Sequence, residues 1–467
     1  MATRPVIRNL NATSVGIINW VLAEESGYLA GAPLAKDTID SIRCVGNFIN
    51  AYQGRQNQFI SALVNRIGMV VIASKSYKNP WSFTKRGMLD AGETIEEIYV
   101  NLAKVENFDP GNTTNALLAD LFGKRKPDVQ TAFHSMNFQK KYPVTVSAEQ
   151  LQTAFTSMEG VSNLIDYVVQ SLYTAVEYDD FLMCKYVLYR LALDGKIKAT
   201  KISALGTEAN DKAAVKAVKA VSNEMTFLKT DYNMAGVYSH TPKDEQMVVI
   251  DTEVDAEIDV EVLASAFNID KVKFEGQRIL VDGFGDTEVA RLDEILDIDT
   301  SGGNHCFTSD ELTAIGTIKM IIMDRDFLME YDKLFQIREM PVANTLEWQY
   351  FLHRWCVYSA SPFKNAALFT TADSAVSSVT VTPSTADAAV GTSLAFTATV
   401  ATTGFISGDV VWSVTGAAKA GTKIGRDGIL VIDPEETGSS STLTVKATSV
   451  ADATKYGTAT VTLVASA

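Results

Sequence analysis

The clearest periodic pattern in the chain is a stripe of apolar residues, spaced three and four apart, that begins near residue 147. Ser147 and Gln150 precede it in the arrangement of a capping box, in which a hydroxyl and a side-chain amide satisfy free backbone groups of the first helical turn. The stripe continues for about seven turns to Val176, which predicts a long helix with one buried face. A second helix is predicted over residues 181–192, ending at Gly195.

Helical and extended patterns alternate in the region that follows, residues 197–334. This mixture predicts an α+β or α/β module. Strands with alternating polar and apolar residues come next, and we expect them to pack beside the long helix. The predicted elements are, in chain order, a helix over 211–228, a strand over 246–250, a helix over 261–267 and strands over 318–323, 342–358 and 363–369.

The composition shifts toward Thr, Ser, Val and Ala at residues 370–374, which predicts a linker. Short strands separated by turn glycines follow, and this rhythm is typical of an antiparallel sandwich. Trp412, in the third of these strands, is expected in the core of the sandwich. The linker and the self-contained strand pattern predict a sandwich that folds independently. No cysteine follows Cys356, so we expect it to fold without a disulfide. The predicted strands are 378–382, 393–400, 410–414, 429–432, 441–448 and 458–464.

The N-terminal region is less regular. Residues 6–51 show no sustained helical or strand period, which favours an arm lying on another part of the assembly. Residues 74–109 form two limbs around a glycine-flanked turn, the first limb basic and the second acidic. Opposite charges stabilise paired strands, and a hairpin with few aliphatic residues has little to bury within its own subunit. We therefore expect a hairpin that contacts a neighbouring subunit, with a solvated surface hairpin as the alternative. The expected contact residues are Lys75, Lys78, Lys85, Arg86, Glu93, Glu96 and Glu97.

Length and charge narrow the classes of function. A chain of 467 residues with 46% apolar and 21% charged residues predicts several folded domains. A net charge of −15 disfavours sequence-independent binding to nucleic acid or anionic membranes. No apolar run reaches the roughly 20 residues that span a bilayer, and the N-terminus makes a poor signal peptide. We expect a soluble, cytoplasmic chain.

Residues capable of chemistry are scattered. Four well-separated cysteines lack the close pairs of zinc or redox sites, so free thiols are expected. His305 and Cys306 are adjacent, but adjacent side chains seldom converge on one atom as a nucleophile and its base. Acidic residues alternate over 251–261 without the central glycine of a calcium loop. We predict no catalytic residues, no bound metal and no cofactor.

Three stretches resemble the major capsid proteins of phi29-like small podoviruses: Arg66-Ile67-Gly68-Met69-Val70-Val71-Ile72, Thr94-Ile95-Glu96-Glu97-Ile98-Tyr99, and the stretch from Ala256 to Asn268. With similar spacing onward, the resemblance covers most of residues 50–370. Three strands of the C-terminal sandwich resemble the group 2 bacterial immunoglobulin-like domain, which the same capsid family carries in the same place. They are Val379-Thr380-Val381-Thr382-Pro383, Val411-Trp412-Ser413-Val414 and Thr444-Val445-Lys446-Ala447-Thr448.

The resemblance implies the Hong Kong 97-type capsid fold, an α+β fold, followed by an all-β immunoglobulin-like sandwich. Its parts would be an N-terminal arm (1–66), an extended hairpin and its return (67–146), a peripheral domain with a spine helix (147–196), an axial domain (197–334), returning peripheral strands (335–372) and the immunoglobulin-like domain (376–467).

The function so implied is structural and not enzymatic: many copies form an icosahedral-type head shell around phage double-stranded DNA. The implied partners are further copies in hexamers and pentamers, a scaffolding protein during assembly, a portal protein at one vertex, and packaged DNA through weak non-specific contact, with no membrane. The implied location is the virion capsid, assembled in the cytoplasm of the bacterial host. Two alternatives stay open, a phage tail or decoration protein and a bacterial surface protein with an immunoglobulin-like binding module.

Overall fold

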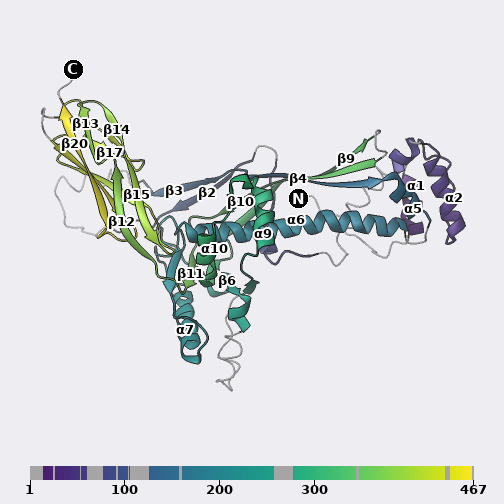
Figure 1. Cartoon of the computed structure of the whole chain (residues 1–467), viewed down its shortest axis with the longest axis horizontal. Coiled ribbons are helices and arrows are strands. Elements are labelled where there is room, and N and C mark those ends of the chain that lie inside the picture. The colour runs from purple at the N-terminus through teal and green to yellow at the C-terminus, as the bar shows by residue number, and fades with distance from the viewer. Residues whose placement is uncertain are drawn as a thin grey trace, which may run out of the picture.

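The long helix α6 (Gly160–Leu193) forms the axis of the computed structural model (Figure 1). Short helices lie at one end of this axis, a mixed α/β module lies beside its other half, and a β-sandwich extends from that second end. The structure describes residues 14–24, 27–52, 54–59, 77–90, 93–103, 105, 126–156, 160–256, 277–342, 347–436 and 442–464.

Helix α6 differs from the two helices expected from the sequence. The capping box is confirmed, but it begins the short helix α5 (Ala148–Ala154). Helix α6 is a separate helix of 34 residues, about 50 Å long, and it passes unbroken through residues 177–180. The acidic residues there continue the helix because they have cationic partners: Asp179 pairs with Arg291, and Asp180 with Arg354.

The expectation of an irregular arm is also corrected, because residues 6–51 include two helices, α1 (Ser14–Glu24) and α2 (Ile39–Asn50). Helix α1 has apolar residues on most of its sides, so its sequence shows no clear helical period of apolar and polar residues. The buried residues of α2 repeat at spacings of three and four, but over twelve residues only. Helix α1 packs on α6, and both helices share a core with its first half that includes Ile18, Ile42 and Leu172.

A four-stranded sheet lies along α6 in the order β1-β9-β10-β4. Its members are β1 (Lys85–Met88), β9 (Leu328–Val342), β10 (Glu347–Ala360) and β4 (Phe138–Ser147). The alternation expected over 342–358 is confirmed in β10, where Trp348, Tyr350 and Leu352 are buried in the same core as the first half of α6. Residue 342 itself ends β9.

The second half of α6 covers one face of a five-stranded mixed sheet in the order β5-β11-β8-β6-β7. Helices α9 (Asp286–Leu296) and α10 (Ser309–Gly316) share that face, while α7 (Glu208–Glu224) covers the other. The predicted helix over 211–228 and the predicted strands are confirmed, but the helix expected over 261–267 lies outside the described residues. The strands are β5 (Lys198–Lys201), β6 (Gln246–Asp251), β7 (Gln277–Val281), β8 (Ile318–Asp324) and β11 (Ala366–Thr370).

The C-terminal region is a β-sandwich built on its own apolar core. Its largest sheet has the order β13-β20-β19-β16, and smaller sheets pair β12 with β15 and β14 with β18 and β17. The sequence pattern missed two short strands and joined β14 to β15. The strands are β12 (Ala375–Thr382), β13 (Thr385–Ala389), β14 (Ser393–Ala395), β15 (Thr397–Thr403), β16 (Val410–Thr415), β17 (Lys423–Ile424), β18 (Ile429–Val431), β19 (Thr442–Ser449) and β20 (Tyr456–Val464).

Candidate functional site

A cluster of buried charges holds α6 to the four-stranded sheet. Arg354 of β10 is 1% exposed, and its guanidinium donates to Asp180 of α6 and Glu330 of β9. It also donates to Asp332 over 3.2 Å. From the edge strand β1, Lys85 places Nζ 2.8 Å from an Asp180 oxygen and 2.9 Å from Glu177. We call these six residues the buried ion cluster.

Burial determines how this cluster titrates. Loss of water raises the pKa of Glu330 to about 8, and the neighbouring Asp180 carboxylate adds to the effect, although Arg354 and Lys85 oppose it. Burial alone would lower the pKa of Lys85, yet Asp180 raises it above its ordinary value. Glu330 therefore takes up a proton at a higher pH than an exposed glutamate does.

We expect Glu330→Gln to remove one component of the pH dependence of stability. Between about pH 4.5 and 8 the folded chain binds a proton at Glu330 that the unfolded chain has released. The stability that this proton contributes is fully present below the unfolded pKa and is lost as the pH rises through the folded one. Urea midpoints of the wild type should fall over this window relative to those of the variant. Parallel curves would contradict the assignment, and Glu96→Gln, at an exposed position, is the control.

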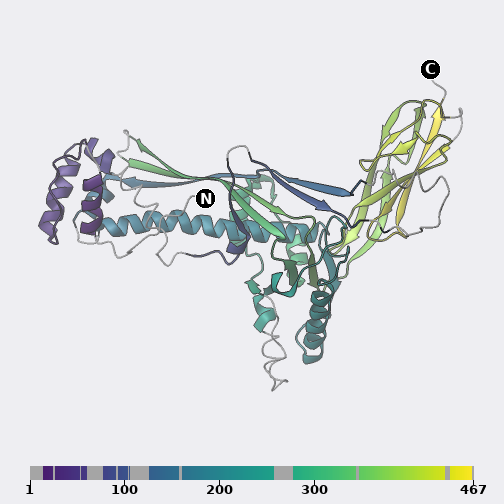
Figure 2. The same cartoon turned by 180° about the vertical axis from the view of Figure 1, so that it is seen from behind.

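A two-stranded ribbon projects from the part of the molecule that holds this cluster. Strand β2 (Ile95–Val100) pairs antiparallel with β3 (Val129–His134), and in both views the ribbon runs toward the sandwich (Figures 1 and 2). Its inner face contacts its own chain: Ile95 is buried, and the Tyr99 ring stacks on Phe363 at 5.5 Å. On the same face, His134 lies 2.6 Å from Ser359 Oγ.

The outer face of the ribbon is apolar and exposed. Register places Ile98 opposite Thr131, Val100 opposite Val129, and Glu96 opposite Phe133, all on this face. The exposed fractions are 62% for Ile98, 54% for Val100, 45% for Val129 and 70% for Phe133. Contiguous exposed apolar residues of this kind mark an interaction surface.

The hairpin expected from residues 74–109 is not formed between its two limbs. Strand β1 of the basic limb pairs in parallel with β9, while β2 of the acidic limb pairs with β3. The basic limb also buries side chains within its own subunit, since Trp81 and Thr84 are 0% exposed. The premise that opposite charges join the limbs was therefore wrong, because each limb found its partner far away in the sequence.

The candidate contact residues accordingly have different surroundings. Lys85 belongs to the buried ion cluster, and Arg86 pairs with Asp326 of the same chain. Glu97 lies on the inner ribbon face, 3.3 Å from His134, and Glu93 accepts the Asp90 amide at 2.9 Å. Lys78 and Glu96 are exposed, and Lys75 lies outside the described residues. The sequence signal that could have identified the outer face is the alternation Glu96, Ile98, Val100.

Trp412 occupies a different place in the sandwich from the one expected. It is half-buried and packs against the edge of the sandwich core, while Phe396 is the aromatic residue at its centre, 2% exposed. Strand β16, which carries Trp412, is the edge strand of its sheet. An edge position leaves one side of the indole open to solvent.

The residues considered for catalysis do not form a reactive pair. The His305 ring contacts Asp293 at 2.7 Å, whereas the Cys306 thiol faces the Val289 carbonyl. Burial and the Asp293 charge raise the pKa of Cys306 to about 12, which suppresses the nucleophilic thiolate. All four cysteines are free. No group of metal-ligating side chains occurs among the described residues, which include only part of the acidic run over 251–261.

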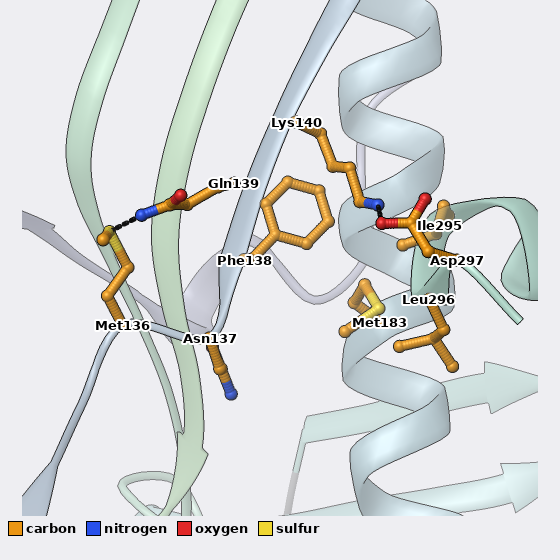
Figure 3. A pocket seen from close by; sticks show the side chains of 9 residues that line it. All are labelled: Met136, Asn137, Phe138, Gln139, Lys140, Met183, Ile295, Leu296 and Asp297. Carbon is orange, nitrogen blue, oxygen red and sulfur yellow. Dashed lines mark hydrogen bonds and ion pairs between the residues drawn. The ribbon is translucent and has the colours of Figure 1, made fainter.

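A hollow of about 500 Å³ lies between β4, α6 and the end of α9. Figure 3 shows Phe138, Met183 and Leu296 around it, with Lys140 bonded to Asp297 at one side. These two opposite charges are the only ones in its lining, and they neutralise each other. The hollow therefore presents no unpaired charge to a ligand. None of the helices in the described ranges is long and apolar enough to span a membrane.

Comparison with known proteins adds an independent line of evidence. The model of the family described as Phi29-like phage major capsid protein matches residues 18–370. The chain is 33% identical over 424 residues to the major capsid protein of Bacillus phage B103, covering 89% of this chain and 85% of that protein. It is 30% identical over 440 residues to the major capsid protein of Bacillus phage PZA, covering 93% and 90%.

A structural comparison matches a chain of the solved "Structure of head fiber and inner core protein gp22 of native bacteriophage P68". The TM-score is 0.50 at 13% identity, and the match covers 64% of this chain and 86% of that one. This likeness concerns the fold. Of the three stretches that carry the resemblance found in the sequence, 94–99 lies in β2 and the residue before it, while 66–72 and 257–268 lie outside the described residues.

Proposed function

The chain belongs to the phi29-like phage major capsid protein family, and we propose that it closes the head shell by laying the outer face of the β2–β3 ribbon on a neighbouring copy. It has the Hong Kong 97-type capsid fold and is part of the virion. The family assignment replaces the two alternatives, a tail or decoration protein and a bacterial surface protein.

The observation that carries this proposal is the asymmetry of the ribbon. Its inner face is held to its own chain by Ile95, Tyr99 and His134, whereas its outer face exposes Ile98, Val100 and Phe133. A two-stranded ribbon is marginally stable alone and gains from cover on its second face. In a shell made of many copies, the surface always present to provide that cover is another subunit.

The charged residues then have a secondary role. We propose that Lys78, Glu93 and Glu96, which are exposed, lie around this apolar contact, together with Lys75. Lys85, Arg86 and Glu97 have partners in their own chain and act by holding the root of the ribbon in place. Exposed ion pairs contribute only about 0–1 kcal/mol, so apolar burial dominates the contact.

The remaining parts of the proposal follow from the family. We infer a protein without catalytic activity that assembles in the host cytoplasm as hexamers and pentamers, with a scaffolding protein and a portal protein as partners. We also infer contact with packaged DNA, and a net charge of −15 would keep this contact weak and non-specific. We also propose that the C-terminal sandwich is immunoglobulin-like. The domain borders are proposed near those expected from the sequence, except that β9 continues across residue 334 and β11 belongs to the five-stranded sheet.

The proposed contact is tested by placing a charge in the outer face of the β2–β3 ribbon. Val100→Glu should leave the melting of the unassembled chain nearly unchanged, because Val100 is 54% exposed. It should reduce the yield of shells by more than about tenfold, since tenfold in an association constant corresponds to about 1.4 kcal/mol, and burying an unpaired carboxylate costs more than that. Sedimentation and negative-stain images measure the yield.

Val450→Glu is the matched control, because Val450 is 58% exposed on the sandwich. This variant should assemble as the wild type does. Normal shell yield from Val100→Glu would show that the ribbon face is not a contact. Equal losses in both variants would show a general effect of added charge.

A further inference from the structure

We infer that the C-terminal sandwich clamps the body of the protein by inserting the loop of residues 404–409 into the body's core at the end of α6. This inference goes beyond the proposed function and does not depend on it. It assigns the sandwich a role in holding the capsid subunit itself together.

The first observation is the place of Phe405. This residue lies between β15 and β16 of the sandwich and is 2% exposed. It does not belong to the core of the sandwich. It belongs instead to the core that α6 forms with the five-stranded sheet, which includes Leu188, Ala192 and Ile197. The body core is therefore incomplete without a side chain supplied by the sandwich.

The second observation is a close approach of backbones. Gly195 follows the last turn of α6 with φ +64°, a conformation that favours glycine. A Cβ atom built there would lie 2.1 Å from the carbonyl carbon of Ile406 and 2.2 Å from the nitrogen of Ser407. The end of the helix and the loop thus fit each other only while residue 195 has no side chain.

Polar contacts around the loop fix its direction. Lys196, next to Gly195, pairs with Asp409, which also accepts a hydrogen bond from Ser407 Oγ at 2.7 Å. The Phe405 amide donates to Ser374 Oγ at 2.9 Å. The Lys196 and Asp409 side chains are 36% and 56% exposed, so this pair orients the loop more than it stabilises it.

A sandwich attached only through residues 371–374 would pivot freely, whereas an inserted phenylalanine fixes it relative to α6. The dependence is mutual, because loss of the insertion opens the body core around Leu188 and Ala192. Local opening of this kind is measured by amide hydrogen exchange.

The experiment uses the full chain, unassembled, with Phe405→Ser and Gly195→Ala made separately. Both should raise hydrogen exchange in the last turns of α6 by more than about tenfold, while β19 and β20 keep their protection. Phe405→Leu, which retains an apolar side chain, should restore part of the protection. Val411→Ser, at a position 60% exposed on the sandwich, is the control and should change neither region.

Two results would overturn the clamp. One is unchanged exchange at the end of α6 in Phe405→Ser, whatever Gly195→Ala does, because an alanine at φ +64° strains the end of the helix by itself. The other is an equal loss of protection in β19 and β20, which would make Phe405 an ordinary core residue of the sandwich. If Phe405→Ser does not fold, the smaller truncation Phe405→Leu decides, and unchanged exchange at the end of α6 in that variant would overturn the clamp.

Discussion

Arg354→Met should destabilise the subunit by about 3–5 kcal/mol, the effect expected when one partner of a buried ion pair is removed. Arg354 is 1% exposed and bonds to carboxylates on two different elements, Asp180 on α6 and Glu330 on β9. Without the guanidinium, Asp180 keeps only Lys85 as a cationic partner. Urea denaturation of the unassembled chain measures the loss.

Arg338→Met on the neighbouring strand is the control, since Arg338 is exposed and its loss should change stability by less than about 0.5 kcal/mol. A combined Arg354→Met, Asp180→Asn and Glu330→Gln variant should recover part of the stability, because it removes the guanidinium together with the two buried carboxyl groups that face it. If the single variant is as stable as the control, the cluster does not hold α6 to the sheet.

Phe396→Ala should cost the sandwich about 3–5 kcal/mol, and Trp412→Ala about half as much. Phe396 is 2% exposed at the centre of the sandwich core, whereas Trp412 is half-buried on an edge strand. This order reverses the one that the sequence favoured, in which Trp412 was the core aromatic residue.

Hydrogen exchange in β19 and β20 of the full chain measures both effects, because these strands form the middle of the largest sandwich sheet. Val431→Ala, 44% exposed on β18, provides a control at the surface of the same sandwich. If Trp412→Ala lowers the protection of β19 and β20 more than Phe396→Ala does, Trp412 contributes more to the sandwich core than Phe396, and this prediction is wrong.

Local periodicity predicted the elements whose burial follows from their own sequence. The alternation Trp348, Tyr350, Leu352 identified β10, and the apolar spacing of α7 identified a helix whose Val215 and Val218 face the central sheet. The longer strands of the sandwich were found in the same way, whereas β13 and β17 were missed and β14 was joined to β15. In each case one face of the element is buried, so a stretch of a few residues already shows the period of apolar and polar side chains.

Contacts between distant segments could not be read in this way. The sequence pattern predicts two helices, one to Val176 and one from residue 181. It does not show that Asp179 and Asp180 continue one helix, because their partners Arg291 and Arg354 lie far along the chain. The basic residue Lys85 looked like half of a charged hairpin for the same reason. A charge pattern shows that a partner is needed, and only the fold shows which residue it is.

The ion pairs described for α6 lie in its second half. Asp179, Asp180 and Lys185 are tied to the sheet and to α9, and Gly195 meets the sandwich loop, while α1 and α2 hold the opposite end through apolar packing. Ion pairs have fixed partners and directions, whereas apolar packing is non-directional. The second half of α6 therefore sets the position of the helix relative to the sheet and α9, and the apolar core around its first half holds the helix without directional bonds.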